Sequence, residues 1–159
     1  MKVEDYLHTA FPDLDVEYRD GEIIERSQPD YLHGKTQGLL VAFFLALSNR
    51  LSLYPCVETR TRIRPGRYLI PDVAVFHPVE PSGVPVTPPL VAIEVLSPDD
   101  RMSEVREKLD EYRTWGVPHV WLIDPRIRRS YMCDAGLIEQ SILQIPELGI
   151  ELSSKDIFR

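Results

Sequence analysis

The sequence predicts an α/β fold in which a mixed β-sheet is flanked by helices and preceded by N-terminal β-hairpins. Three features predict it: paired strand-like segments near the N-terminus, one long helical segment, and a buried strand–helix–strand unit in the second half. With 159 residues the chain has the length of one domain, so we expect residues 1–159 to form a single domain. Its hydrophobic fraction of 43% is ordinary for a globular protein and excludes disorder of the whole chain.

The first third of the chain carries a helix, a hairpin and a second, long helix. A short helix is expected over Val3–Ala10. Val16–Arg19 and Glu22–Glu25 flank Asp20-Gly21, a pair that favours the two-residue type I′ turn of a β-hairpin. Apolar residues then recur at helical spacing, which predicts one amphipathic helix over Tyr31–Leu51.

A second hairpin and a buried strand are expected next. Polar and apolar residues alternate over Val57–Arg64, Pro65-Gly66 marks a turn, and Tyr68–Phe76 is the expected returning strand. Five prolines between residues 78 and 89 then predict an irregular loop that cannot pair in a sheet. The nearly continuous apolar run Leu90–Leu96 is typical of a central strand that is covered on both faces.

The remaining elements complete the expected sheet. A helix is predicted over Arg101–Trp115 and a parallel buried strand over Val120–Ile123. A hairpin is expected from Arg128–Cys133 and Leu137–Leu143, and a short helix from Ser154. The buried face of the Arg101–Trp115 helix is predicted at four positions: Met102, Val105, Leu109 and Tyr112.

The composition limits the class of protein. The chain has 25 acidic and 18 basic residues, and its net charge of −7 argues against a broadly basic DNA-binding surface without excluding a local basic stripe. Two cysteines are too few for a disulfide scaffold and indicate a reducing, cytoplasmic location. The N-terminus lacks the apolar core of a signal peptide, and no run of 18 apolar residues is present to span a membrane.

Two acidic residues interrupt strongly apolar strands. Glu94 lies inside Leu90–Leu96, and Asp72 follows Pro71 inside the expected strand Tyr68–Phe76. An unpaired buried carboxylate costs several kcal/mol, so each one needs a cation, a proton or a partner. Two carboxylates on adjacent strands suit Mg²⁺ or Mn²⁺, whose other ligands are water and phosphate oxygens. A core salt bridge for Glu94 and a turn aspartate for Asp72 are the alternatives.

Lys108 is the third candidate for the same site. It flanks the predicted buried face of the Arg101–Trp115 helix, so its stem can lie on the sheet while its ammonium reaches the carboxylates. Alternatively, it is a solvated lysine that pairs with Glu104 or Glu111 at helical spacing.

These residues belong to a series of motifs that resembles a known family. The series comprises Pro71-Asp72, Glu94–Pro98, Lys108–Tyr112, Gly116-Val117 and Trp121–Pro125. Weaker matches extend it over nearly the whole chain: Asp20–Ile23, His33 and Ile157-Phe158. In this order and spacing the motifs are similar to those of the Uma-type restriction endonuclease family, within the PD-(D/E)XK nuclease superfamily. The resemblance implies a restriction-endonuclease-like fold for the mixed sheet and its helices.

The resemblance also implies roles for particular residues. Asp72 and Glu94 would hold the metal ion, and Lys108 would assist the attacking water. The superfamily pattern places its lysine two residues after the second acid, where this chain has Leu96. The family places that lysine on the following helix, and Lys108 fits this position.

Other positions are candidates with simpler alternatives. Glu22 matches an acidic family position and would add a third carboxylate. His33 opens the long helix and is either a site residue or a capping or core histidine. Arg60, Arg62 and Arg64 alternate along one expected strand face and could follow the phosphates of DNA. A solvated, charge-balanced strand face is the alternative for these arginines.

The predicted function is a Mg²⁺- or Mn²⁺-dependent endonuclease that hydrolyses DNA. Because cleavage of both strands needs two sites and one domain offers one, we expect a homodimer. Two alternatives stay open: a catalytically weak nuclease-fold component that binds DNA or protein in a mobile-element or DNA-processing complex, and a hydrolase of another phosphorylated small molecule. The sequence has no Walker-type glycine loop, zinc-protease helix or serine-hydrolase elbow.

Overall fold

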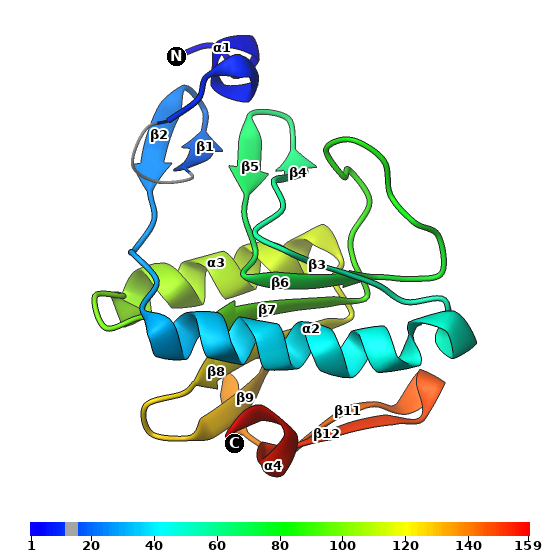
Figure 1. The fold of residues 1–159 in the computed structure, drawn as a ribbon. Coiled ribbons are helices and arrows are strands. Elements are labelled where there is room, and N and C mark those ends of the chain that lie inside the picture. Colours follow the sequence, from blue (N-terminus) through cyan, green and yellow to red (C-terminus); the bar gives the residue numbers. More distant parts are fainter. Residues whose placement is uncertain (12–15) are drawn as a thin grey trace.

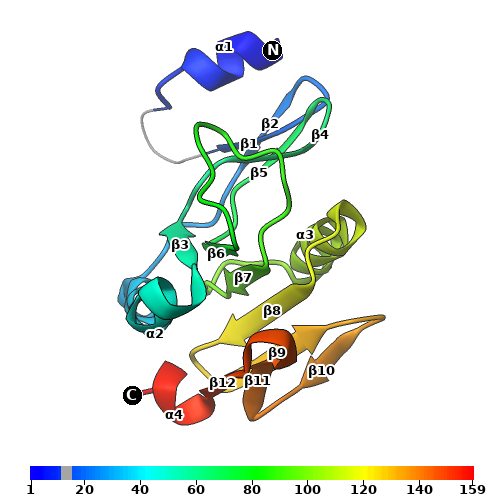
Figure 2. The same cartoon turned by 90° about the vertical axis from the view of Figure 1, so that its right-hand side faces the viewer.

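A six-stranded mixed sheet between two long helices forms the centre of the structure (Figures 1 and 2). The computed structural model describes residues 1–11 and 16–159. The strand order is β10-β9-β8-β7-β6-β3, in which β7 and β8 are parallel and the other neighbours are antiparallel. The strands are β3 (Tyr54–Val57), β6 (Val73–Phe76), β7 (Val91–Val95), β8 (His119–Asp124), β9 (Arg129–Cys133) and β10 (Leu137–Glu139).

The two helices cover opposite faces of this sheet, as Figure 2 shows. Successive strand residues point to opposite faces, so Ile93 of β7 packs in the core under α2 (Tyr31–Leu51), and Ala92 packs in the core under α3 (Met102–Trp115). The long helix has the predicted bounds, and the unit β7–α3–β8 has the predicted parallel strands. The predicted α/β class with a mixed, helix-flanked sheet is confirmed.

A second sheet lies at the N-terminal end of the molecule, beside α1 (Val3–His8) in Figure 1. Its order is β2-β1-β5-β4. The strands are β1 (Val16–Arg19), β2 (Glu22–Glu25), β4 (Thr61–Arg64) and β5 (Arg67–Leu69). Asp20 and Gly21 both have positive φ, at 48° and 99°, which confirms the predicted tight hairpin turn. Three tyrosines pack together between α1 and this sheet: Tyr6, Tyr18 and Tyr68.

The prediction of two continuous strands for the second hairpin is wrong. Val57–Arg64 and Tyr68–Phe76 each divide, so that β4 and β5 belong to the N-terminal sheet whereas β3 and β6 belong to the central sheet. The bends have local causes: Glu58 has a positive φ of 45°, and Pro71 lacks the N–H that a strand pairing would need. The hairpin therefore connects the two sheets.

Two further expectations need correction. The segment Leu137–Leu143 divides, because β10 pairs with β9 whereas β11 (Ile142–Ile145) pairs with β12 (Ile150–Ser153) and packs Leu143 into the core under α2. Met102, which was predicted on the buried face of its helix, is 39% exposed as the first residue of α3, whose buried residues are Leu109 and Tyr112.

The C-terminal elements close the chain. A 3₁₀ turn, η1 (Pro146–Leu148), joins β11 to β12, and the predicted last helix is α4 (Ser154–Ile157). Its N-terminus is held by a capping box in which the Ser153 and Asp156 side chains each bond the other's backbone N–H. None of the described helices is long and apolar enough to cross a membrane.

Two glycine substitutions test the helix assignments. Gly116 ends α3 with φ at 107°, a backbone conformation that strains any residue with a Cβ atom. Gly38 lies exposed within α2, and a Cβ atom there would meet nothing within 4 Å. We expect Gly116→Ala to lower the free energy of unfolding by ~1 kcal/mol or more and Gly38→Ala to raise it by ~0.5–1 kcal/mol. Urea denaturation of both variants would measure these changes, and equal effects would contradict the assignment.

Candidate active site

A cavity of about 570 Å³ opens between the N-terminal sheet and the first turns of α2 and α3. The structure brings five of the sequence-predicted residues to this cavity: Glu22, His33, Asp72, Glu94 and Lys108. Arg60, Arg62 and Arg64 do not line it. The cavity is the candidate active site because the carboxylates and the lysine meet at its inner wall.

The sheet register explains why Asp72 and Glu94 meet. Strand β6 pairs antiparallel with β7, with Val73 opposite Ile93, so Asp72 lies opposite Glu94 where β6 begins. Opposite residues of an antiparallel pair project to the same face. That face is the one covered by α3, which carries Lys108.

The Asp72 carboxylate is buried and held by three donors. Oδ2 accepts a hydrogen bond of 2.7 Å from the Val95 backbone N–H and lies 3.4 Å from His33 Nε2. Oδ1 accepts one of 2.8 Å from Arg26 Nη2. Burial opposes the charged form of Asp72, but His33, Lys108 and Arg26 outweigh it and lower its pKa to about 2.

Lys108 is buried between two carboxylates, which contradicts the alternative of a solvated lysine. Its Nζ lies 2.6 Å from Glu17 Oε1 and 3.1 Å from Glu94 Oε1, and it donates to the Ile70 carbonyl at 2.9 Å. Glu17 Oε1 also accepts the Ile70 N–H at 3.0 Å. The three ammonium donors thus have three protein acceptors.

Glu94 has the opposite electrostatic character from Asp72. Its Oε1 accepts a hydrogen bond of 2.8 Å from the Tyr112 hydroxyl. Burial is the largest influence and raises the pKa of Glu94 to about 8; Lys108 opposes the shift, and the negative charges of Asp72 and Glu17 add to it. The surroundings of the two carboxyl groups therefore shift their pKa values in opposite directions.

His33 and Glu22 take different places at the cavity. Asp30, not His33, caps α2, since its side chain accepts the His33 N–H at 2.9 Å. The His33 ring is buried; burial opposes its protonation, but Asp72 outweighs burial and raises the pKa of His33. Within residues 1–11 and 16–159, His33 Nδ1 is a buried atom without a hydrogen-bond partner. Glu22 lines the cavity but is exposed.

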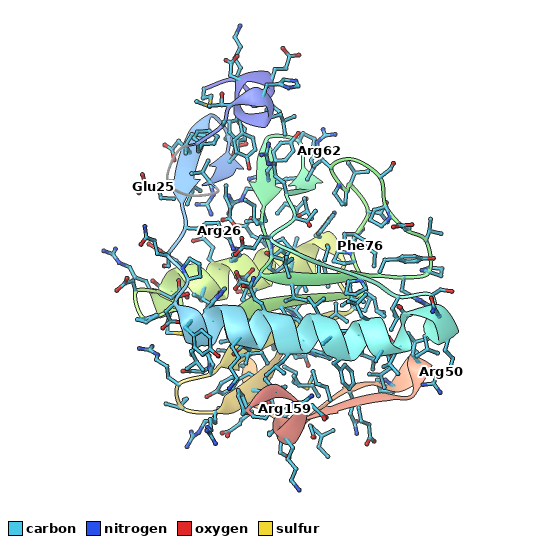
Figure 3. The ribbon with its side chains drawn as sticks, in the orientation of Figure 1. Glu25, Arg26, Arg50, Arg62, Phe76 and Arg159 are labelled. Atoms are coloured by element: carbon cyan, nitrogen blue, oxygen red, sulfur yellow. The ribbon has the colours of Figure 1, made fainter. Side chains whose placement is uncertain are left out.

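The three arginines do not form the single strand face that the alternation predicts. Strand β4 begins at Thr61, after Arg60, and a bulge falls between Arg62 and Arg64. Arg60 lies over the Tyr6 ring with 4.8 Å between its guanidinium carbon and the ring centroid, and Arg64 pairs with Asp20 at 3.2 Å. Arg62 is an exposed residue of β4 (Figure 3). Contact between these arginines and DNA stays a prediction.

Three residues at the site were not predicted from the sequence. Glu17 lies in β1, and Arg26 lies in the segment between β2 and α2 (Figure 3). Tyr112 was predicted as a buried apolar contact, which its position confirms. A buried tyrosine hydroxyl needs a hydrogen-bond partner. The predicted burial of Tyr112 was therefore the one sequence feature that pointed to a further polar contact at the site.

The donor set fits a hard divalent cation bound by two carboxylates. Both hydrogen bonds to Glu94 go to Oε1, and Oε2 accepts none from the residues that the structure describes. The same residues contain no group of three or more His, Cys, Asp and Glu side chains placed to hold a metal ion. Mg²⁺ is often bound by one or two carboxylates, with water and substrate oxygens as its other ligands.

Comparison with known proteins identifies relatives of the chain. The family described as "Uma2: Putative restriction endonuclease" matches residues 3–158. A crystal structure of "a putative nuclease belonging to DUF820 from Anabaena variabilis ATCC 29413" superimposes with a TM-score of 0.83 at 21% identity, covering 99% of this chain and 97% of that one. This likeness confirms the predicted nuclease-like fold. No curated protein matches the chain.

Glu94→Gln should change how stability depends on pH. Because the pKa of Glu94 rises from 4.5 to about 8 on folding, its stabilising contribution is complete below pH 4.5 and is lost as the pH rises to about 8. In EDTA, we expect the free energy of unfolding of the parent to fall over this range relative to that of Glu94→Gln. Urea denaturation at several pH values measures it, with Glu139→Gln, on the exposed end of β10, as control. A relative rise would contradict the raised pKa of Glu94.

Proposed function

Because the chain belongs to the Uma2 family, we propose that it is a metal-dependent endonuclease that hydrolyses DNA phosphodiester bonds. The observation that carries the proposal is the meeting of Asp72, Glu94 and Lys108 at the inner wall of one cavity. Hydrolysis of a phosphodiester needs an activated water and positive charge around the phosphate. These residues supply ligands for a divalent cation and one fixed positive charge.

Each residue has a proposed role. Asp72 and Glu94 hold Mg²⁺ or Mn²⁺, which when bound would neutralise phosphate charge and activate water. Lys108 contributes a fixed charge, since protein acceptors occupy its three donors. A positive charge held in place in a buried site stabilises negative charge that develops during the reaction. Tyr112 orients Glu94 through its hydroxyl.

The acidic lining of the cavity supports a second candidate function. Acidic side chains outnumber basic ones around it, and the chain has a net charge of −7. Both features weaken attraction to a DNA backbone. They favour a nuclease-fold component that works within a larger DNA-processing complex and has little activity alone. Incubation with plasmid, single-stranded DNA and RNA over a Mg²⁺ or Mn²⁺ titration separates the two: cleavage by the isolated protein supports the endonuclease, and binding without cleavage supports the component.

Substitutions at the site should separate metal binding from chemistry. Asp72→Asn and Glu94→Gln should weaken metal binding, because each replaces an anionic ligand with a neutral one. Lys108→Ala should leave metal affinity unchanged or slightly higher, yet reduce cleavage ~100-fold or more.

Calorimetric metal titration and a plasmid-cleavage assay measure the two effects. Lys155→Ala, an exposed lysine on α4, is the control and should behave as the parent does. If Lys108→Ala cleaves as fast as the parent at saturating metal, the proposed role of Lys108 fails.

We also propose that the active form is a homodimer, because cleavage of two strands needs two such cavities. Light scattering should give twice the 18.3 kDa mass of the chain. A strict monomer at every workable concentration would leave nicking or binding as the activities that this cavity can support.

A further inference from the structure

We propose that Arg26 occupies the cation's place at Asp72 in the metal-free protein, and that a divalent cation binds there by displacing the Arg26 guanidinium. The inference rests on the proposed cation site of Asp72 and Glu94. It makes Arg26 a positioning residue that competes with the metal ion. Three observations support it: the hydrogen bonds of Asp72, the position of Arg26 outside the helices and strands, and the fixed positions of the neighbouring cations.

The two carboxylate oxygens of Asp72 differ in how accessible they are to a metal ion. Oδ2 accepts the Val95 N–H at 2.7 Å, a bond to the backbone of the central strand β7. Breaking that bond would leave a buried backbone donor without a partner, which is costly. Oδ1 is bonded by Arg26 Nη2 at 2.8 Å. A cation that takes Asp72 as a ligand without disturbing β7 must therefore approach Oδ1, where the guanidinium lies.

The three positive or protonatable side chains near Asp72 differ in how firmly the fold holds them. Lys108 is fixed between Glu17, Glu94 and the Ile70 carbonyl, and His33 is carried by the long helix α2. Arg26 instead lies on residues 26–30, a segment outside the helices and strands that joins β2 to α2. Figure 3 shows it below the β1–β2 hairpin on this connecting segment. Arg26 is thus the cation that can leave.

The cavity next to Arg26 has room for a displaced guanidinium. The Arg26 side chain is 15% exposed, and it lines the cavity. In the described part of the chain, Asp72 is the one acidic partner of Arg26, so no second ion pair holds it. A guanidinium and a divalent cation that both contact one carboxylate oxygen repel each other strongly, because their positive charges lie close together. Metal binding therefore favours rotation of the guanidinium into the cavity.

Calorimetric titration of the full chain with Mn²⁺ tests the proposal. We expect Arg26→Gln to bind Mn²⁺ about ten-fold more tightly than the parent, because it removes the competing charge. Arg19→Gln is the matched control: Arg19 lines the same cavity but pairs with Glu107 and Glu111. We expect it to change the affinity less than about two-fold. If Arg26→Gln binds Mn²⁺ no more tightly than Arg19→Gln, the displacement is overturned.

A double variant tests whether the effect acts through Asp72. In the Asp72→Asn background, Arg26→Gln should give no tightening, because the ligand for which Arg26 competes is gone. The same ten-fold gain in that background would overturn the proposal by showing a general charge effect.

Two further measurements guard against loss of folding. Arg26→Gln leaves the buried Asp72 charge without its partner, so the apo variant should have a lower Tm than the parent. Saturating Mn²⁺ should raise the Tm of Arg26→Gln more than that of the parent, and a smaller rise would count against displacement. Arg26→Lys keeps the charge and should bind Mn²⁺ with an affinity near that of the parent; tightening equal to that of Arg26→Gln would overturn the charge argument.

These experiments separate the inference from the proposed function. Metal affinity is measured without DNA, so tight Mn²⁺ binding by Arg26→Gln in a protein that cleaves nothing would support displacement and contradict the endonuclease. Cleavage by the parent with equal Mn²⁺ affinity in parent and Arg26→Gln would contradict displacement alone. The absence of both a heat of Mn²⁺ binding and a Mn²⁺-induced rise in Tm in every variant would overturn both.

Discussion

The buried ammonium of Lys108 joins parts of the chain that lie far apart in the sequence. Glu17 comes from the N-terminal hairpin, Ile70 from the bend between the two sheets, and Glu94 from the central strand β7. A buried charge is tolerated only when it is paired and hydrogen-bonded. Lys108 therefore ties the N-terminal sheet to the central sheet alongside the apolar contacts of Leu69, and the cavity lies beside this charged contact.

Charge compensation also explains the opposite pKa shifts of two carboxylates on one wall. Burial opposes the anion of Asp72, but the His33 hydrogen bond and the charges of Lys108 and Arg26 outweigh burial and lower its pKa to about 2. Glu94 is equally buried but faces the negative charges of Asp72 and Glu17, and its pKa rises to about 8. Because Lys108 is shared between Glu17 and Glu94, one ammonium cannot neutralise both. When Glu94 is ionised, the three carboxylates of Glu17, Asp72 and Glu94 exceed the two cations Lys108 and Arg26, and a divalent cation would offset that excess of negative charge.

The sequence predicted the elements that depend on local interactions. The Asp20-Gly21 turn and the α2 helix follow from residues that are neighbours in the chain, and their bounds agree with the structure. The division of the second hairpin between two sheets depends on long-range pairing, which alternation does not encode. At the site, Asp72 and Glu94 stood out as charges inside apolar strands, and Lys108 stood out as a charge beside the predicted buried face of its helix. Glu17 and Arg26 gave no such signal, because each looks like a solvated residue until the two sheets are brought together.

The central claim is that a divalent cation binds between Asp72 and Glu94 in place of Arg26. Anomalous diffraction from crystals of the protein grown with Mn²⁺ tests it most directly, because it locates the ion and the guanidinium together. We predict one anomalous peak within coordination distance of Asp72 Oδ1 and a Glu94 carboxylate oxygen, with the Arg26 side chain turned into the cavity. Arg26 still bonded to Asp72 in crystals whose Mn²⁺ binds elsewhere, or not at all, would contradict the account.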